Sequence, residues 1–376
     1  MNVRIQTQKN LAFEDQPDPL ETAEVAKEIK PRKPASPVKS AEIELDLMLP
    51  TSGTPKVEAV AGDNGGGDVR LRIGNFRPGV HVFPPGTKTQ AVEPLGNKSR
   101  TLSKPLEVEA FLPEHLALRP VPQKLPAALK SPPFIQALAA DEREAGNQAT
   151  TVFAPENRRV FHDTAYPWSC CGRVDTPNGQ GSGVMVGPRH LLTVSHVIRW
   201  NSDGTTGWIR FIPSYFDGSA PFGTAWGVLT YFKYKVDGPT IDWIEGMYDY
   251  VCVVLNWPIG NWTGWHGTRG YTDSWDGGAY WAHIGYPGDL TAGNRPTFEN
   301  GISLDGAWWE FDSHEAMSHH GDVWPGQSGG PFFGWWSGEV GPRAVAVQSS
   351  QNSSENNASG GQDLVDLVIR ARNEHP

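Results

Sequence analysis

Residues 187–198 read Gly-Pro-Arg-His-Leu-Leu-Thr-Val-Ser-His-Val-Ile, an apolar run that leads directly into His196. A strand that ends in this way places an imidazole at the edge of a sheet. Similar short runs, rich in Val, Ile, Trp and Tyr, recur after Thr151 and are separated by Gly, Pro, Asn and Asp. Many short strands at this spacing predict an antiparallel β-sandwich or β-barrel.

Beyond Thr151, helical periodicity appears only at the end of the chain, where Leu364, Leu367, Val368 and Ala371 fall on one face. We therefore expect an all-β domain with a C-terminal helix. The expected strands are Gly183–Val186, Leu191–Val194, Trp208–Ile212, Val228–Tyr234, Tyr250–Leu255, Tyr280–Gly285, Trp308–Phe311, Pro331–Trp335 and Ala344–Gln348.

The first 150 residues differ in composition from the rest. All 15 Trp and all 9 Tyr lie beyond residue 165, whereas 18 of the 32 Pro lie before residue 151. A segment poor in large aromatic residues and rich in Pro and charge buries too little apolar surface to offset its chain entropy. We expect residues 1–150 to be largely disordered, except for a strand at Val69–Phe76 and a helix at Pro133–Glu144, and residues 151–376 to form the folded domain.

Charge and hydropathy exclude several classes of protein. A net charge of -10 argues against nucleic-acid binding, and no run of 18 apolar residues exists to span a membrane. The first 30 residues lack the apolar stretch of a secretory signal. Three cysteines, Cys170, Cys171 and Cys252, allow at most one intrachain disulfide. Their spacing fits no zinc site, and we expect no metal and no cofactor.

Three local patterns carry the chemistry. The strand before His196 is the first. The second is Asp249, which opens the apolar run Tyr250–Leu255, where a carboxylate is costly unless it has a partner. The third is Gly326-Gln-Ser-Gly-Gly-Pro331, in which glycines permit a tight turn that exposes the hydroxyl of Ser328.

These residue types form a catalytic unit. The Ser328 hydroxyl needs a neighbouring base to act as a nucleophile, and His196 supplies it. Asp249 would orient the imidazole and stabilise its protonated form. The N–H groups of Gly326 and Ser328 would bind the oxyanion, and the loss of one such donor costs about 3 kcal/mol of transition-state stabilisation.

Two other residue patterns compete with this interpretation. Asp242 competes with Asp249 as the acid, but no apolar strand follows it. The histidines of His314-Glu-Ala-Met-Ser-His-His320 invite a zinc site. Their spacing departs from His-Glu-x-x-His, so a solvated loop is favoured there.

The order His, Asp, Ser and these local contexts resemble the chymotrypsin-like serine peptidases, and more narrowly their glutamyl endopeptidase branch. Thr164-Ala-Tyr-Pro-Trp168, Gly285-Tyr-Pro-Gly-Asp289 and the Gly-Gln-Ser-Gly loop carry the narrower similarity, which covers Thr151 to Asp366. The resemblance implies a double β-barrel and a serine endopeptidase that acts on proteins or peptides through an acyl-enzyme. It also implies secretion, which the missing signal segment does not support.

The resemblance further implies that residues 1–150 are a propeptide, removed near Thr150–Val152. Gln327 stands where trypsin-like enzymes carry an Asp that pairs with the new N-terminal amine. A neutral amide cannot form that ion pair, so the activation chemistry must differ.

The specificity pocket is where the sequence departs from the branch. Gln348 occupies the position of an expected His and offers no positive charge, so we expect no strict preference for acidic residues. Asp322 stands at the position that gives trypsin its preference for Arg and Lys. The glutamyl branch often has Asp there without that preference, so we infer no preference for basic residues. Val197 replaces a frequent Cys, so a disulfide beside His196 is absent.

Two other functions fit the same residues. The chain could be a non-enzymatic binding pseudo-peptidase on this fold, or an esterase that uses the same triad. We expect a monomer that binds neither nucleic acid nor membranes.

Overall fold

A computed structural model describes residues 16–35, 86–126 and 152–376, with gaps at 97, 99–101, 103, 239, 307–314 and 352–353. It also describes residue 129 and the backbone of residues 56–61 and 69–74. The chain divides into two compact units, residues 37–84 and the remainder. In the small unit, β1 (Lys56–Ala61) pairs antiparallel with β2 (Val69–Gly74), which confirms the predicted strand at Val69. The predicted helix at Pro133–Glu144 lies outside the described residues.

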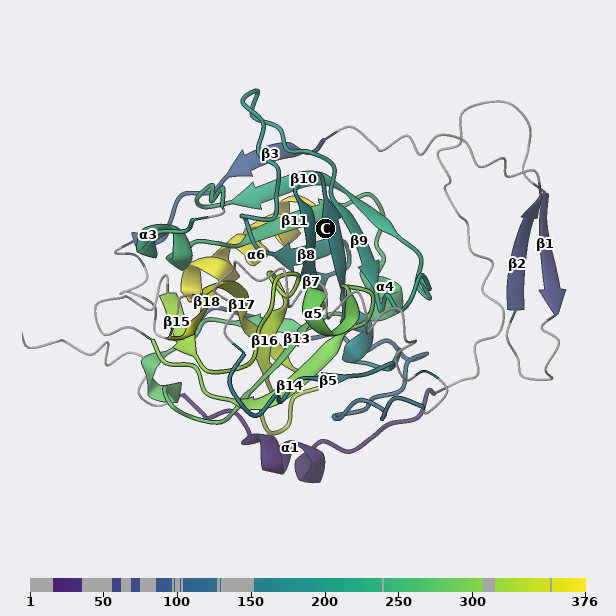
Figure 1. The fold of residues 1–376 in the computed structure, drawn as a ribbon, viewed down its shortest axis with the longest axis horizontal. Coiled ribbons are helices and arrows are strands. Elements are labelled where there is room, and N and C mark those ends of the chain that lie inside the picture. The colour runs from purple at the N-terminus through teal and green to yellow at the C-terminus, as the bar shows by residue number, and fades with distance from the viewer. Residues whose placement is uncertain are drawn as a thin grey trace, which may run out of the picture. The chain divides into compact units, whose positions relative to one another are not determined.

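The first barrel of the large unit is closed (Figure 1). Its strands follow the order β11-β8-β7-β6-β9-β10, and β10 pairs back with β11. All these pairings are antiparallel. The strands are β6 (Cys171–Thr176), β7 (Gly179–Gly187), β8 (His190–Thr193), β9 (Arg210–Pro213), β10 (Ala225–Phe232) and β11 (Val251–Leu255).

The second barrel is built on a nine-stranded sheet with the central order β15-β18-β17-β16-β13-β14. An antiparallel bridge between Asp305, just after β14, and Ser318 of β15 closes this ring. Three short strands extend the sheet, since β5 pairs with β14, β12 pairs with β17, and β4 pairs with β12. The strands are β4 (Glu107–Val108), β5 (Arg159–Val160), β12 (Gly267–Arg269), β13 (Trp281–Gly285), β14 (Thr297–Ile302), β15 (Glu315–His319), β16 (Pro331–Gly334), β17 (Arg343–Gln351) and β18 (Asn356–Gly360).

Two closed barrels and a C-terminal helix confirm the expected fold class. The helix α6 (Gln362–Glu374) buries Leu364, Leu367, Val368 and Ala371 completely, as its periodicity predicts. The other helices in the described residues are one to two turns long. They are α1 (Thr22–Glu28), η4 (Trp168–Cys170), α3 (Trp243–Met247), α4 (Gly260–Thr263), η5 (Asp273–Trp275) and α5 (Gly288–Thr291). None of the helices in the described part of the chain is long and apolar enough to cross a bilayer.

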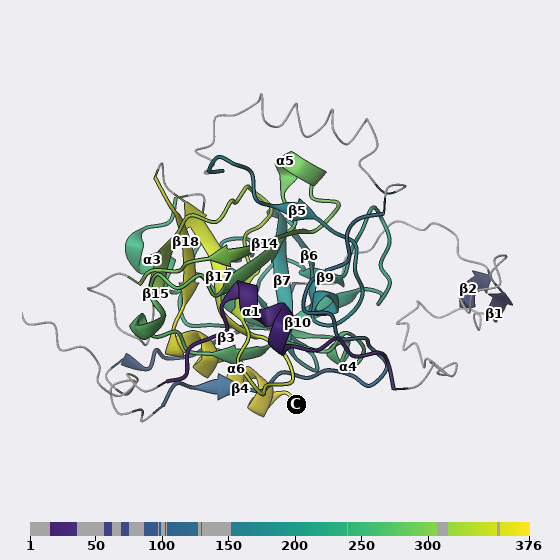
Figure 2. The same ribbon diagram turned by 90° about the horizontal axis from the view of Figure 1, so that it is seen from below.

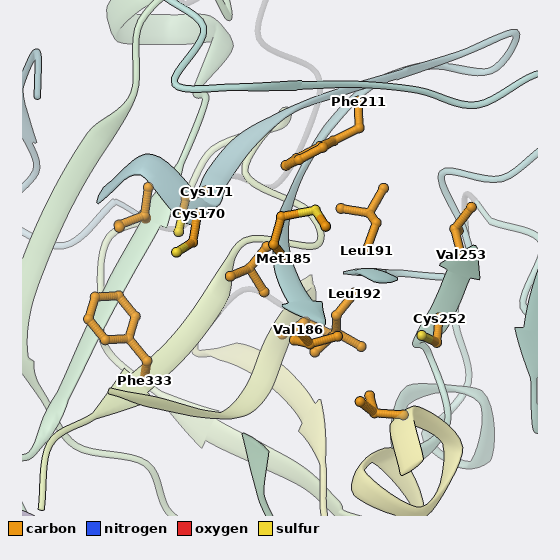
Figure 3. Packing of buried hydrophobic residues seen from close by; sticks show 14 of the residues in the cluster. Cys170, Cys171, Met185, Val186, Leu191, Leu192, Phe211, Cys252, Val253 and Phe333 are labelled. Atoms are coloured by element: carbon orange, nitrogen blue, oxygen red, sulfur yellow. The ribbon is translucent and has the colours of Figure 1, made fainter. Parts of the chain in front are cut away.

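The interior of the first barrel is filled by the inward-facing side chains of its strands. Figure 3 shows Met185, Leu191 and Phe211 gathered in this core, and all three are fully buried. Cys170 and Cys171 lie together on one side of the core, and Cys252 lies apart from them. All three cysteines are buried free thiols. Burial raises the pKa of the Cys252 thiol to about 12, so at neutral pH it is an inert apolar group.

Two segments from the first 150 residues form part of the large unit. Residues 16–35 pack under the second barrel through α1 (Figure 2). The N–H of Leu20 donates to the carbonyl of Trp335 at 2.7 Å, and Val25 and Ile29 are buried in the core. For this segment, the expectation of loose structure does not hold, because burial against a preformed domain supplies the apolar contacts that the segment lacks by itself.

The second segment, residues 86–126, joins both barrels. Its strand β3 (Lys88–Ala91) adds to β10 in parallel, and Leu118 is buried between Arg32 and Tyr166, with which it shares backbone bridges. Arg119 forms an ion pair of 2.6 Å with the fully buried carboxylate of Asp163. Residues 86–126 are thus packed against the folded domain, and the predicted boundary at 150/151 stays a prediction. Elsewhere in residues 1–150 the expectation stays a prediction.

We expect Leu118→Ala to lower the free energy of unfolding by about 2–5 kcal/mol, because it opens a cavity in a packed core. Val121→Ala is the matched control, since Val121 lies in the same segment but is 51% exposed, and it should change stability by less than about 0.5 kcal/mol. Urea unfolding measures both variants. Equal stability of Leu118→Ala and the parent would show that this segment is not part of the folded unit.

Candidate active site

His196 and Asp249 meet at one end of the first barrel. Strand β8 ends at Thr193 and pairs with Val251 at the start of β11, so the residues just beyond these strand ends are neighbours. The imidazole Nδ1 of His196 lies 2.6 Å from Oδ2 of Asp249, and the backbone N–H of His196 donates to Oδ1 at 2.9 Å. The antiparallel pairing thus delivers the predicted His and Asp to each other.

A third donor reaches the same carboxylate from the second barrel. The hydroxyl of Ser349, on β17, donates to Oδ2 of Asp249 at 2.6 Å. The carboxylate is completely buried, so these three bonds replace the water that it lost on folding. The sequence analysis did not identify this role of Ser349. Nothing in the local pattern marks one serine of a polar strand end as a carboxylate ligand.

The competing acid, Asp242, has a structural role instead. It is the N-cap of α3, where its carboxylate accepts the N–H of Glu245 at 2.8 Å in a capping box. The preference for Asp249 is therefore consistent with the geometry.

The surroundings of His196 favour its protonated form. Its side chain is 18% exposed, and burial alone would lower the pKa of the imidazole. The negative charge of Asp249 and its hydrogen bond to Nδ1 outweigh burial, so the pKa of His196 is raised above its ordinary value. An imidazole with this partner accepts a proton readily, which a general base requires.

The loop that carries Ser328 is attached to both barrels. The N–H of Gly329 donates to the carbonyl of Gln348, and the N–H of Gln348 donates to Gly330, both at 2.8 Å. On the other side, the N–H of Ser182, in β7, donates to the carbonyl of Ser328 at 2.7 Å. The nucleophile loop is therefore fixed between β17 and β7.

Two glycines of this loop cannot be replaced without strain. Gly326 has φ +101°, and a Cβ there would lie 2.4 Å from the carbonyl oxygen of Tyr286. Gly329 has φ +84°, and a Cβ there would lie 2.2 Å from the hydroxyl of Thr193, three residues before His196. The glycine pattern of the sequence thus reflects real close approaches, as predicted.

The N–H groups of Gly326 and Ser328 are available for a ligand. The intervening N–H, of Gln327, donates to the carbonyl of Trp324 at 3.1 Å. Within the described residues, the N–H groups on either side of it donate to no protein acceptor. One of these donors belongs to the nucleophile Ser328 itself and the other lies two residues before it, so the pair could form an oxyanion hole.

No hydrogen bond joins Ser328 to His196 within the described residues, but the segments that carry them are neighbours. A Cβ built on Gly181 would lie 2.9 Å from the carbonyl oxygen of Ser328 and 3.1 Å from Cγ1 of Val197, the residue after His196. The two segments therefore border the same glycine. Hydrogen bonds between a catalytic Ser and His are often long without substrate and tighten in the complex.

Comparison with known proteins finds peptidases among the proteins similar to this chain. No protein-family model matches the chain. A glutamyl endopeptidase from Bacillus licheniformis is 28% identical over 207 residues, which make up 54% of this chain. The chain is therefore similar to a glutamyl endopeptidase over about half of its length. The match spans 61% of that relative's length.

Two solved structures give more distant likenesses. A Glu endopeptidase in complex with MPD is 19% identical, with a TM-score of 0.49, and the match covers 59% of this chain and 99% of that one. Protease Anisep from Arthrobacter nicotinovorans is 19% identical, with a TM-score of 0.40, and the match covers 54% of this chain and 93% of that one.

The carboxylate of Asp322 already has hydrogen-bond partners within the protein. It is fully buried, and it accepts the backbone N–H groups of Phe153 at 2.6 Å and Asn157 at 2.7 Å. Beside it, burial and the charge of Asp322 raise the pKa of Glu299 to about 8. This arrangement satisfies Asp322 from within the protein, so it gives no support to a preference for Lys or Arg.

Gln348, the other predicted pocket residue, is held by a neutral histidine. His319 Nδ1 accepts the N–H of Gly321, so its Nε2 carries the proton and donates to Oε1 of Gln348 at 2.9 Å. The amide of Gln348 donates in turn to the carbonyl of Ser350 at 3.1 Å. Burial and the nearby His283 lower the pKa of His319 to about 3, so it brings no positive charge to Gln348.

The sequence pattern around His319 suggested a zinc site. In the structure, His319 bonds to Gln348 instead. Among the described residues, no three side chains of His, Cys, Asp or Glu are grouped so as to hold a metal ion. His314, the other end of that pattern, lies outside the described residues.

An NMR titration of the imidazoles tests the electrostatics of the site. We expect His196 to titrate above the ordinary value of about 6.5, and the buried His190, which has no acid partner among the described residues, to titrate near a pKa of about 4. Asp249→Asn should lower the pKa of His196, because the charge that favours the imidazolium is gone. An unchanged pKa in that variant would contradict the assigned pair.

The same shift sets the sign of a stability effect. Because the folded-state pKa of His196 is raised, the folded protein binds this proton more tightly than the unfolded chain does. The stabilisation is complete below the unfolded pKa and is lost as pH rises through the folded value.

Proposed function

We propose that this chain is a serine endopeptidase that hydrolyses peptide bonds through a covalent acyl-enzyme. The observation that carries the proposal is the buried carboxylate of Asp249, which holds His196 at 2.6 Å beside the loop of Ser328. The homology to a glutamyl endopeptidase supports the same reaction class.

In the first half of the reaction, Oγ of Ser328 attacks the carbonyl carbon of the substrate, and Nε2 of His196 takes the hydroxyl proton. The N–H groups of Gly326 and Ser328 donate to the oxyanion of the tetrahedral intermediate. Asp249 stabilises the imidazolium that forms. The intermediate collapses when His196 gives its proton to the leaving amine, which departs and leaves an ester on Ser328.

In the second half, a water molecule takes the place of the amine. His196 removes a proton from the water, whose oxygen attacks the ester carbonyl. The same oxyanion donors stabilise the second tetrahedral intermediate. Return of the proton to Oγ releases the carboxylic acid product and restores Ser328.

The proposed substrates are proteins or peptides. Gln348 is neutral, and the carboxylate of Asp322 is bonded within the protein, so we propose neither a strict acidic nor a basic preference. Removal of a propeptide near residues 150–152 stays a prediction. If cleavage occurs there, the packing of residues 16–35 and 86–126 would keep the N-terminal part bound.

The test is the replacement of the nucleophile. Ser328→Ala should reduce hydrolysis of a casein substrate by about 10⁴-fold or more, because the acyl-enzyme cannot form. Ser195→Ala, which removes a buried hydroxyl bonded to Val236 rather than the nucleophile, should retain activity. Full casein turnover by a folded Ser328→Ala variant would reject the proposal.

Labelling by an organophosphonate separates the peptidase from its alternatives. An active protein should gain the phosphonyl mass on Ser328, whereas a pseudo-peptidase should remain unmodified. An esterase would be labelled but would leave casein intact while cleaving ester substrates.

A further inference from the structure

Arg158 is a buried cation next to the nucleophile loop. It directly precedes β5, the edge strand that pairs with β14 of the second barrel, and its side chain is 1% exposed. The guanidinium donates to both oxygens of Asp289, at 2.7 and 3.1 Å. It also donates to both oxygens of Glu156, at 2.7 and 2.9 Å. A buried charge is stable only with such partners.

These carboxylates also keep Arg158 charged. Burial disfavours the guanidinium, but the hydrogen bonds and charges of Glu156 and Asp289 outweigh it and raise the pKa of Arg158 above its ordinary value. Asp289 belongs to the Gly-Tyr-Pro-Gly-Asp turn, so this motif of the sequence supplies a counter-ion. If these ion pairs were the only contacts of Arg158, its role would be structural support alone.

One further bond of Arg158 goes beyond ion pairing. Its Nη1 donates to Oε1 of Gln327 at 2.8 Å, and the N–H of Trp324 donates to the same oxygen at 2.9 Å. The side chain of Gln327 is buried, and a Cβ built on Gly285 would lie 2.7 Å from its Cγ. Gln327 therefore has one fixed orientation.

Gln327 lies between the two oxyanion donors. Its own N–H turns away to the carbonyl of Trp324, and this leaves the N–H groups of Gly326 and Ser328 free of protein acceptors within the described residues. Rotation of the peptide units around Gln327 would move both donors. Whatever anchors the Gln327 side chain thus sets the geometry of the oxyanion hole.

We propose that Arg158 is a positioning residue that holds the oxyanion hole in shape through Gln327. The role rests on the proposed peptidase function. In trypsin-like enzymes, an Asp at the position of Gln327 pairs with the new N-terminal amine. Here the residue is a neutral amide, and its cationic partner is Arg158, which belongs to the folded domain and donates to Oε1 of Gln327. Asp289 and Glu156 hold the guanidinium at the correct place, and Arg158 itself does not touch the substrate.

The test compares kcat and KM for Arg158→Met and Gln327→Ala. Each should lower kcat by roughly 10²-fold, as the loss of one oxyanion donor does, with KM changed less than about threefold. The double variant should be no slower than the slower single variant, because both changes break one unit. The rate of phosphonylation of Ser328 should fall in parallel with kcat, which a loss of stability alone would not cause.

Arg295→Met is the matched control. Arg295 is 2% exposed and paired with Asp217 at 2.6 Å, but it makes no hydrogen bond to the nucleophile loop among the described residues. This variant should lower the melting temperature and leave kcat unchanged. Gln327→Ala removes a neutral side chain, so it keeps the proposal testable if Arg158→Met fails to fold.

The proposal is overturned if Gln327→Ala keeps kcat within threefold of the parent. It is also overturned if the effects of the two single variants multiply in the double variant. Failure of the peptidase function itself would look different, because the parent protein would then show no turnover that depends on Ser328.

Discussion

The active site depends on a single buried charge, the carboxylate of Asp249. A carboxylate without water is costly unless hydrogen-bond donors replace its hydration. Here the donors come from His196 on the first barrel and Ser349 on the second. Because each barrel contributes, the carboxylate is satisfied only when the two barrels are packed together. The folding of the whole domain and the alignment of the imidazole are therefore linked through one group.

A second buried charge supports the opposite side of the nucleophile loop. Arg158 reaches Gln327 from the edge of the second barrel, and Asp289 and Glu156 neutralise it. The loop of Ser328 thus lies between two polar clusters, one that orients the base and one that we propose orients the oxyanion donors. In both, a residue on a short loop is fixed by groups on strands, which gives a precise geometry to an irregular backbone.

The sequence was informative where the pattern is local. The runs that became β7, β8, β11, β16 and β17 are apolar and contain β-branched or aromatic residues, and the periodicity of α6 identified its buried face. It was uninformative where a strand is polar. Residues Asn356–Gly360 form β18 although they read like a loop, because cross-strand pairing with β15 and β17 outweighs their weak strand propensity. The predicted strand at Trp308–Phe311 lies outside the described residues.

The same contrast, between local sequence patterns and contacts formed only in the fold, applies to the active site. His196, Asp249 and Ser328 stand out because each has a distinctive neighbourhood in the chain. Ser349 and Arg158 do not, since their roles arise from contacts with residues 100 and 169 positions away. The N-terminal segments show the same limit at a larger scale. Leu20 and Leu118 lie in Pro-rich stretches that predict disorder, and they are buried only because the rest of the domain offers a surface to cover.

A crystal structure of the protein with a peptide boronic acid would reveal how the catalytic groups are arranged around a bound inhibitor. We expect a tetrahedral boron bonded to Oγ of Ser328, with one boron-bound oxygen about 2.7–3.1 Å from the N–H groups of Gly326 and Ser328. Nε2 of His196 should lie within hydrogen-bond distance of the adduct, and Asp249 should still hold Nδ1. An adduct on another residue, or one whose oxygen points away from both N–H groups, would contradict the account.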